Sequence, residues 1–323
     1  MDQHNIIGHD QFQYRVDTQW SKANPKTHPV NNCHEMVQVP DGRLFMITDV
    51  PDNNILIYNT DGELLDSWTL NMESGHGLTL SIASGIPYLY ICDTQGRVVK
   101  TDLDGNIIFE LPTPAQVGAY SANMDYKPTQ TAVSPNGDIY ITDGYGSQFI
   151  IQFNKQGEFI RKFGGKSILP TNKGKFYQCH GIALDTRGET PLLVVTSRLR
   201  NEFQWFTLEG EFVKNVYLPG VYMSRPVIEG DFLYSAVCMG TYPKDFRPWL
   251  KRGFVIILDK NDLVVSAPGA HQPEYDTEGQ LEHLYQQSNI IDHGHDVCVD
   301  TEGNLYVLQW LADQVYPYKF YKI

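Results

Sequence analysis

The sequence predicts an all-β protein: a six-bladed β-propeller whose blades are four-stranded antiparallel sheets. A pattern of alternating apolar residues followed by a glycine turn returns at intervals of roughly 40 to 50 residues, which is the period of propeller blades. Within each copy, Asn, Asp and Gly separate short segments of period two, as in tight hairpins. No window of helical length has the spacing of an amphipathic helix, apart from a short turn expected over residues 281–287. Four short antiparallel strands per copy are typical of a propeller blade.

Each clear copy of the repeat starts with His or Thr and reaches a glycine eight positions later. These pairs are His34 and Gly42, Thr129 and Gly137, His180 and Gly188, and His295 and Gly303. A fifth copy has one extra residue between His76 and Gly85, and a sixth is degraded around a turn at Gly230. We therefore expect a single domain over residues 1–323, with blades at about 33–70, 75–112, 128–165, 179–218, 224–268 and 294–323.

The last copy is one strand short, because little chain follows residue 316. Residues 1–32 form an N-terminal segment, and within it residues 10–20 (DQFQYRVDTQW) alternate as a strand does. We expect this segment to supply the missing outer strand and close the ring. A β-sandwich with coincidental spacing is the alternative.

Charge and composition narrow the classes of partner and location. The 25 Lys and Arg residues against 38 Asp and Glu give a net charge of −13, which repels phosphate backbones and anionic lipids. We therefore expect no nucleic-acid or membrane partner, and a monomer. No apolar run is long enough for a membrane span, and no signal peptide begins the chain, so we expect a soluble protein, cytoplasmic or secreted after loss of a leader. The five scattered cysteines are expected to be free thiols.

Four histidines share one position of the repeat. The first strand of each blade lines the central channel of a propeller, so His34, His76, His180 and His295 should converge at one mouth. Thr129 and Arg225, or a neighbour of Arg225, fall at this position in the other two blades. Imidazole is a common metal ligand, and three histidines with an open position are a catalytic zinc arrangement. The alternative is a set of packed core histidines bonded to backbone carbonyls.

Motifs at these strand starts resemble a known enzyme family. The segments HGLTL at His76, HGIAL at His180 and HD at His295, with PTQTAV and DGY between Pro128 and Tyr145, resemble peptidyl-α-hydroxyglycine α-amidating lyase, also called peptidylamidoglycolate lyase. That family is a six-bladed propeller of the NHL-repeat type, and the resemblance runs from about residue 33 to the C-terminus. It implies a catalytic zinc on His76, His180 and His295.

The resemblance also implies roles for other residues. Tyr145 would be the base that acts on the substrate hydroxyl, and Arg198 would contact an anionic group of the substrate. A structural calcium would lie on the Asp296 carboxylate and the carbonyl of Leu78, which are hard oxygen ligands.

The chain departs from the family pattern around the substrate. A second active-site arginine of the family is replaced in the region 48–50, and its disulfide is absent near Tyr126 and Gly146. His34 is additional, and His293 stands where the family has methionine. We therefore expect His34, His293 and Arg225 to be substrate contacts or extra ligands.

The function predicted from these residues is that of a zinc-dependent lyase. It would cleave a C–N or C–O bond next to a hydroxyl group of a small or peptide-like substrate. Two alternatives remain open: a metal-dependent hydrolase or lyase acting on a small sugar-derived substrate, and a non-catalytic NHL propeller that serves as a binding platform. Metal content separates the enzymes from the platform.

Overall fold

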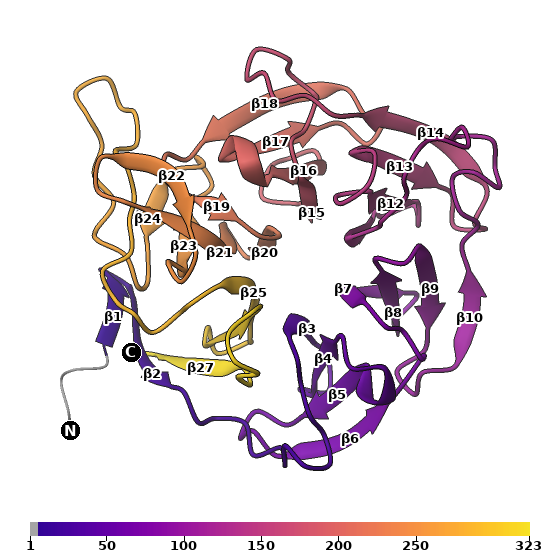
Figure 1. Ribbon diagram of the computed structural model, residues 1–323, viewed down its shortest axis with the longest axis horizontal. Coiled ribbons are helices and arrows are strands. Elements are labelled where there is room, and N and C mark those ends of the chain that lie inside the picture. Colours follow the sequence, from indigo (N-terminus) through magenta and orange to yellow (C-terminus); the bar gives the residue numbers. More distant parts are fainter. Residues whose placement is uncertain (1–5) are drawn as a thin grey trace.

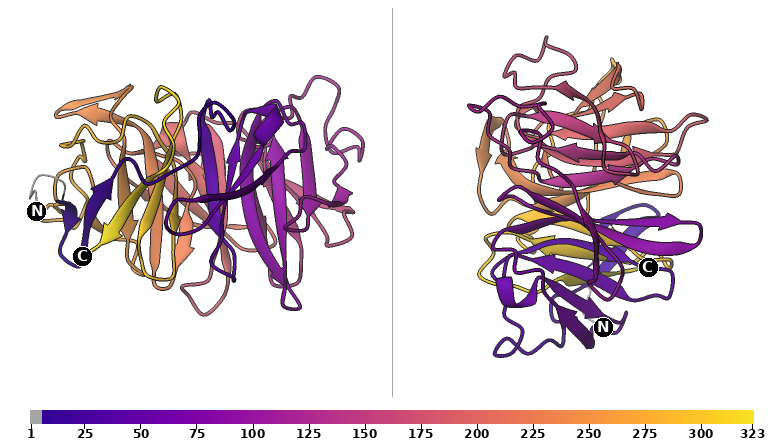
Figure 2. Two further views of the ribbon diagram at one scale, coloured as in Figure 1. Left: turned by 90° about the horizontal axis from the view of Figure 1, so that it is seen from below. Right: turned by 90° about the vertical axis from the view of Figure 1, so that its right-hand side faces the viewer.

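The computed structural model describes residues 6–323 and contains six antiparallel sheets in a ring around a central channel (Figure 1). Seen from the side, the ring is a thick disc whose strands cross from one face to the other (Figure 2). The predicted fold class, an all-β six-bladed propeller, is confirmed. Within the described residues no helix is long and apolar enough to cross a bilayer.

The first four blades have the simple up-and-down order. Blade 1 contains β3 (Cys33–Gln38), β4 (Leu44–Thr48), β5 (Ile55–Tyr58) and β6 (Leu64–Trp68). Blade 2 contains β7 (Gly75–Ala83), β8 (Ile86–Asp93), β9 (Arg97–Thr101) and β10 (Ile107–Glu110). Blade 3 contains β11 (Gln130–Val133), β12 (Ile139–Thr142), β13 (Phe149–Phe153) and β14 (Phe159–Gly164). Blade 4 contains β15 (Cys179–Asp185), β16 (Leu192–Ser197), β17 (Glu202–Phe206) and β18 (Phe212–Tyr217).

Blade 5 is the irregular blade. Its inner edge is split into β19 (Tyr222–Met223) and β20 (Val227–Glu229), since Pro226 between them has no N–H to donate to the neighbouring strand. The other strands of its main sheet are β21 (Phe232–Tyr242), β23 (Phe254–Leu258) and β24 (Val264–Ser266). The end of β21 pairs with β22 (Asp245–Trp249), so the insertion in this blade forms a hairpin.

The two ends of the chain meet in blade 6. The strands β25 (Gly294–Val299), β26 (Leu305–Gln309) and β27 (Tyr318–Lys322) are completed by β2 (Phe12–Asp17), with Tyr14 opposite Lys322. The predicted closure by the N-terminal segment is therefore confirmed. A further strand, β1 (Ile6–His9), pairs with β2 on its outer side.

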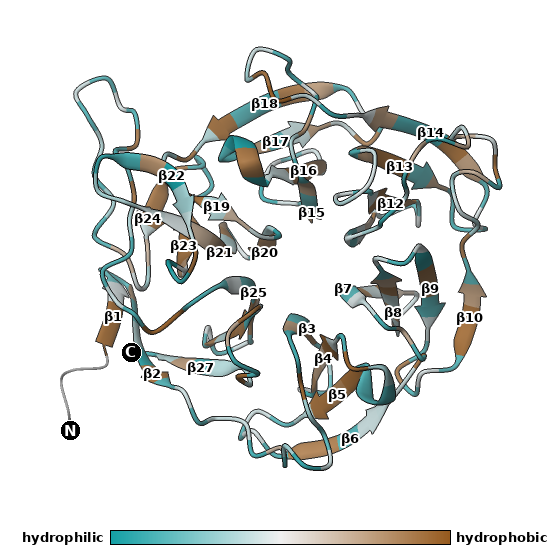
Figure 3. Ribbon diagram, in the orientation of Figure 1, coloured by the Kyte–Doolittle hydropathy of each residue, from teal (hydrophilic) through white to brown (hydrophobic). Residues whose placement is uncertain are grey.

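Apolar side chains fill the space between neighbouring blades. Successive residues of a strand point to opposite faces, so each sheet packs against a blade on either side. Between blades 1 and 2, for example, Phe45 and Ile47 pack in one cluster with Leu78, Leu89 and Ile91. Figure 3 shows β5 and β10 as strongly hydrophobic; β5 is buried, whereas β10 is the outermost strand of its blade.

Two details concern expected local structure. The helical turn expected over residues 281–287 is absent: this segment makes extended bridges, Tyr275 with Leu281 and Ala270 with Gln286. Leu284 is buried in the blade 4 and 5 core, so tertiary packing determines its conformation.

The five cysteines are buried and free, as expected.

Candidate metal centre

The inner strands place two layers of side chains in the channel. The first, the histidine layer, has six members: His34, His76, Thr129, His180, Ser224 and His295. The next residue along the chain in each blade belongs to the second layer, which we call the charged layer after Glu35, Arg225 and Asp296. Its other members are Gly77, Gln130 and Gly181. Arg225 thus belongs to the second layer, one position away from the place that the repeat pattern gave it, and Ser224 takes that place.

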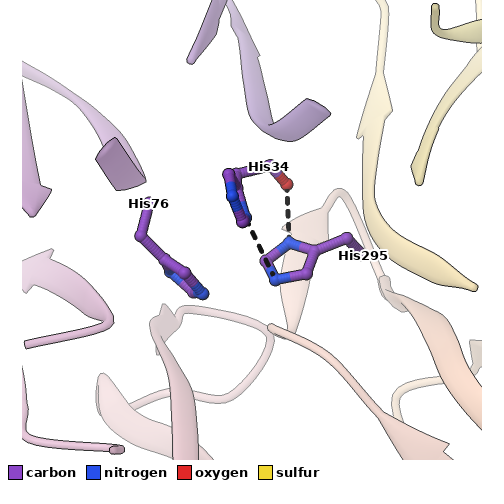
Figure 4. A group of neighbouring side chains, drawn as sticks. All are labelled: His34, His76 and His295. Carbon is purple, nitrogen blue, oxygen red and sulfur yellow. Dashed lines mark hydrogen bonds between the residues drawn. The ribbon is translucent and has the colours of Figure 1, made fainter. Parts of the chain in front are cut away.

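The four predicted histidines come together at the centre of the ring. The ring centroids of His34, His76 and His295 lie 4.7 to 4.8 Å apart, and Figure 4 shows these three rings facing one another. The His180 ring lies 5.0 Å from both His76 and His295. All four side chains are buried.

Backbone carbonyls fix which nitrogen of two of these rings is protonated. His76 Nδ1 donates to the carbonyl of Thr129 at 2.8 Å, and His295 Nδ1 donates to the carbonyl of His34 at 2.8 Å. A carbonyl oxygen can only accept, so Nε2 of each neutral ring carries a lone pair. Burial lowers the pKa of both rings well below the ordinary value, and neighbouring histidines add to this effect on each, so both are neutral near pH 7.

The Asp49 carboxylate lies beside the third ring, that of His34. Asp49 Oδ2 lies 3.6 Å from His34 Nε2, while Asn32 donates to Asp49 from its backbone N–H at 3.0 Å and its side-chain amide at 2.6 Å. Burial raises the pKa of Asp49, but the bonds from His34 and Asn32 outweigh it and bring the pKa below its ordinary value. While Nε2 of His34 lies beside this carboxylate, His34 Nδ1 lies 3.4 Å from His295 Nε2.

The nitrogen atoms of the cluster fit a bound metal ion. His34 Nδ1 and His295 Nε2 lie 3.4 Å apart, close enough for both atoms to bind one cation. Among residues 6–323, no hydrogen-bond partner lies at either ring nitrogen of His180, although this side chain is buried. Such orphaned polar atoms are unfavourable in an apolar interior unless a ligand satisfies them. One ring nitrogen from each of His34, His76 and His295 lies within 4.8 Å of the others, so these residues could hold an ion.

Tyr145 and Arg198 border the same cluster. The Tyr145 hydroxyl lies 3.3 Å from His76 Nε2, and its ring is 5.5 Å from the His180 ring. Asp143 shapes this loop by accepting bonds from the backbone N–H groups of Lys127 and Ser147. Burial raises the pKa of Tyr145, whereas the charge of Arg198 lowers it. Tyr145 is 37% exposed, so it lies where the cluster meets solvent.

Arg198 is held by the backbone next to the histidine layer. Its Nε donates to the carbonyl of Met223 at 3.0 Å, and Nη2 donates to Ser224 Oγ at 3.1 Å. Its positive charge contributes to the lowered pKa of His180, after the larger effect of burial. The guanidinium can therefore attract an anionic group to the cluster.

The charged layer lies next to the histidine layer along the channel. Arg225 donates to both carboxylate oxygens of Asp296, at 2.6 and 2.8 Å, and to the carbonyls of Leu78 at 3.1 Å and Met36 at 2.8 Å. Glu35 lies 3.6 Å from the same guanidinium and is fully buried. The Arg225 guanidinium therefore makes its hydrogen bonds with Asp296 and these two carbonyls, and not with the histidine layer. This position does not support the contact with substrate or metal that we expected for Arg225.

The expected calcium ligands face this guanidinium. Asp296 and the carbonyl of Leu78 do lie close together, as the resemblance implies, but the cation between them is the side chain of Arg225. A guanidinium already satisfies these oxygens, so the arrangement argues against calcium at this position. This partnership was not predictable from the repeat pattern, because such a pattern does not show which residue of another blade reaches the centre.

His293 lies outside the cluster. Its Nε2 accepts the backbone N–H of Lys251 at 2.9 Å, and its Nδ1 donates to the carbonyl of Leu311 at 3.0 Å. Both ring nitrogens of His293 therefore make hydrogen bonds to the backbone of connecting loops. The contact with substrate or metal expected for His293 finds no support in this position.

Glycine at two positions of the charged layer lets the strands approach. A Cβ atom at Gly77 would lie 2.6 Å from the Thr129 carbonyl, the oxygen that accepts from His76. At Gly181 it would lie 2.4 Å from Cα of Arg225. Glycine after His76 therefore leaves room for the carbonyl that orients the His76 ring, and glycine after His180 leaves room for the backbone of Arg225.

Sequence reasoning missed Asp49 and Glu35 as members of the site. Asp49 was noted only as part of a region that lacks an arginine. The signal that could have found Glu35 is its place directly after a channel histidine, the place that Asp296 has in blade 6.

Fold and site together define a class: a six-bladed propeller with a buried histidine cluster at its channel. Comparisons with known proteins agree with the propeller fold. No protein-family model matches the chain. Human NHL repeat-containing protein 3 is 25% identical over 189 residues, 55% of this chain and 53% of that protein. Peptidyl-glycine alpha-amidating monooxygenase A of Xenopus laevis is 24% identical over 249 residues, 72% of this chain and 24% of that protein. The corresponding mouse monooxygenase is 28% identical over 145 residues, 41% of this chain and 15% of that protein.

The chain is thus similar to NHL-repeat proteins and to peptidylglycine amidating monooxygenases, and spans about half or less of each curated relative. Among solved structures, a gluconolactonase of Xanthomonas campestris superposes with a TM-score of 0.64 at 12% identity, covering 99% of this chain and 95% of that one. A streptogramin B lyase superposes with a TM-score of 0.58 at 13% identity, covering 95% and 97%. At such identities these structures show the fold alone.

Proposed function

We propose that this protein is a metal-dependent lyase that cleaves a C–N or C–O bond next to a hydroxyl group of a small or peptide-like substrate. One observation carries the proposal: imidazole nitrogens from separate blades face one another inside a buried cluster, with His34 Nδ1 3.4 Å from His295 Nε2. Similarity to an amidating monooxygenase over 72% of the chain supports the same reading.

The residues of the cluster fit the metal without any carboxylate ligand. The ring nitrogens of His34, His76 and His295 lie within 4.8 Å of one another and would hold the metal, whereas the resemblance implies His76, His180 and His295. The His180 ring lies beside this group, 5.0 Å from the His76 and His295 rings. Burial keeps His76, His180 and His295 neutral, so their nitrogens are available without loss of a proton. When bound, zinc would supply a positive charge that makes the substrate hydroxyl more acidic.

Tyr145 is placed to take the proton of that hydroxyl as a phenolate. Burial raises its pKa, so it would act as a base after losing its own proton, which the positive charge of a bound metal would favour. Its own hydroxyl group lies 3.3 Å from His76 Nε2 and beside Arg198, so it borders the space where a substrate oxygen would lie. As the proton leaves, the C–O bond becomes a carbonyl double bond. The bond from the same carbon to the leaving nitrogen or oxygen breaks with its electron pair, and the leaving atom takes up a proton. No oxidant or reductant is needed.

Arg198 would orient the substrate for this step. Its Nε and Nη2 are fixed by Met223 and Ser224, which presents the guanidinium to the cluster with little freedom. An anionic group bound there would hold the reacting carbon between the histidines and Tyr145.

The test combines metal analysis with turnover. Protein stripped with a chelator and reloaded with zinc should retain about one ion per chain, as a three-histidine catalytic site does. His76→Ala should lose the ion, whereas His28→Ala, a change in a loop outside the cluster, should keep it. Peptides ending in α-hydroxyglycine are then assayed for glyoxylate release, together with other hydroxylated acids and sugar lactones. Absence of bound metal in the wild type, or hydrolysis of lactones alone, would overturn the proposal.

A further inference from the structure

The channel has a second mouth on the side away from the histidines. The inner strands β3, β7, β11, β15, β20 and β25 surround the channel, and the histidine layer lies at their starts (Figure 1). Further along these strands the channel opens into a cavity of about 490 Å³. Within residues 6–323, its lining includes Gln130 and Arg225 of the charged layer and no member of the histidine layer. The charged layer therefore separates this cavity from the histidine cluster.

One position of the repeat gives the cavity its apolar wall. The residue four places after each member of the histidine layer lines the cavity, and in five of the six blades this residue is aliphatic. We call this set the aliphatic layer: Gln38, Leu80, Val133, Leu184, Ile228 and Val299.

The five aliphatic side chains are half-buried. Each packs on one side against the core between blades, as Leu80 does between blades 1 and 2 and Leu184 between blades 3 and 4. Their remaining apolar surface lines the cavity. Gln38 adds little polarity, because its Nε2 donates to the carbonyl of Gly42 at 3.2 Å and its Oε1 accepts from the backbone N–H of Thr301 at 3.1 Å.

A concave apolar surface of this size is typical of a small-molecule site. Such sites have volumes of roughly 300 to 1,000 Å³ and are lined mainly by apolar side chains with a few polar groups. Apolar surface that stays open to water at one place on a folded chain indicates a binding site, because a packed core would have covered it.

The charge of the lining indicates which molecules fit. Within residues 6–323 its two charged residues are Arg225 and Glu229. Asp296 neutralises Arg225 through two hydrogen bonds, whereas Glu229 is exposed at the end of β20 and gives the mouth a negative charge. The net charge of −13 adds to this negative potential. An ammonium group is therefore attracted to the mouth, and a carboxylate is repelled.

We propose that this cavity binds a small molecule with an apolar body and a single ammonium group. The apolar body lies against the aliphatic layer, and the ammonium group lies at the mouth beside Glu229. Arg225 closes the inner end, because its bonds to Asp296 and to the carbonyls of Met36 and Leu78 cross the channel. The inference goes beyond the proposed function and needs neither a metal nor lyase activity.

The first test varies the ligand. Butylamine, pentylamine and hexylamine are titrated at pH 7, where they are protonated, and binding is followed by ligand-observed NMR. Burial of the alkyl chain should tighten binding about fourfold per methylene group. Hexanol should bind up to about fivefold more weakly than hexylamine, because it lacks the exposed pair with Glu229, and hexanoate should bind more weakly still. No saturable binding of hexylamine, or equal affinities for hexylamine and hexanoate, would overturn the inference.

The second test fills the cavity. Leu184→Trp should abolish hexylamine binding, whereas Leu65→Trp, the same change at an exposed position of the outer strand β6, should keep it. If Leu184→Trp does not fold by circular dichroism, Leu80→Trp fills the cavity from blade 2. Equal binding by the wild type and a folded cavity-filling variant would place the amine elsewhere and refute the site.

The third test concerns the mouth. Glu229→Gln should remove the preference for hexylamine over hexanol, whereas Glu189→Gln, in the exposed turn between β15 and β16, should keep it. An unchanged preference in Glu229→Gln would contradict the position of the ammonium group.

One variant separates this inference from the proposed function. His76→Ala should bind hexylamine as the wild type does, because the charged layer lies between the two sites. Loss of amine binding in His76→Ala would place the amine at the histidine cluster and overturn the inference. Absence of metal or of lyase activity, with amine binding retained, would refute the proposed function alone.

Discussion

Arg225 and Asp296 form a bidentate ion pair at the centre of the propeller, with Nε 2.6 Å from Oδ1 and Nη2 2.8 Å from Oδ2. The same guanidinium reaches the carbonyls of Met36 in blade 1 and Leu78 in blade 2. One side chain from blade 5 therefore joins four blades. It has the place that the family resemblance assigns to calcium.

Removal of this guanidinium should destabilise the fold strongly. Arg225→Ala leaves the Asp296 carboxylate buried without a partner, and breaking a buried pair in this way costs about 3–5 kcal/mol of unfolding free energy. Denaturant titration measures the loss. Arg97→Ala, which removes the exposed pair with Glu110, is the control and should cost about 1 kcal/mol or less. Similar losses in the two variants would contradict the central role of Arg225.

Calcium should have no effect on the stability of the wild type. The oxygens that would bind it already accept from Arg225, so a calcium chelator should leave the melting temperature unchanged, and added calcium should not raise it. Thermal unfolding with and without the chelator checks this. A calcium-dependent rise would contradict this prediction.

Tyr145→Phe should retain the metal and lose turnover. The phenyl ring preserves the packing against His76 and His180, while the group that takes the proton is gone, so we expect a loss in kcat of roughly 10²- to 10⁴-fold. Metal content and kcat are measured on the same preparation, with Tyr217→Phe on an exposed outer strand as control. Unchanged turnover in Tyr145→Phe would remove this residue from the mechanism.

Gly77→Ala should disturb the cluster through the backbone. The added methyl group would lie 2.6 Å from the Thr129 carbonyl that orients His76, and overpacking of this kind costs about 1–3 kcal/mol. Metal affinity should fall together with stability. Gly188→Ala has no heavy atom nearer than 3.9 Å and no positive φ, so it should be close to neutral. Equal behaviour of the two variants would contradict the close approach.

Glu35 should make the stability of the metal-free protein depend on pH. Burial raises its pKa to about 8, with Arg225 acting against the rise and Asp296 adding to it, whereas an unfolded Glu has a pKa of about 4.3. Between these values the folded state holds a proton that the unfolded state has lost, so stability falls as pH rises. Glu35→Gln should flatten this slope, and Glu63→Gln, at the surface, should not. Parallel slopes in all three proteins would exclude Glu35 as the cause.

The repeat pattern was sufficient to predict the architecture. Alternating residues and glycine turns are local signals, and they recur in each blade because each blade repeats the same local geometry. The histidine register likewise predicted that His34, His76, His180 and His295 would meet, since equivalent positions of inner strands face one axis. In blade 5 the pattern left the place open between Arg225 and a neighbour, and the structure puts the neighbour Ser224 among the histidines, with Pro226 interrupting the inner edge.

The sequence by itself therefore determined the six-bladed ring, its closure by β2 and the gathering of four imidazoles at its axis. Only the tertiary structure decided which side chains partner across blades: Asp49 with His34, Arg225 with Asp296, and His293 with the loops. The physical reason is distance along the chain. A repeat shows where each side chain leaves its own strand, whereas a partner from another blade, up to 261 residues away in this cluster, is fixed only when the ring closes.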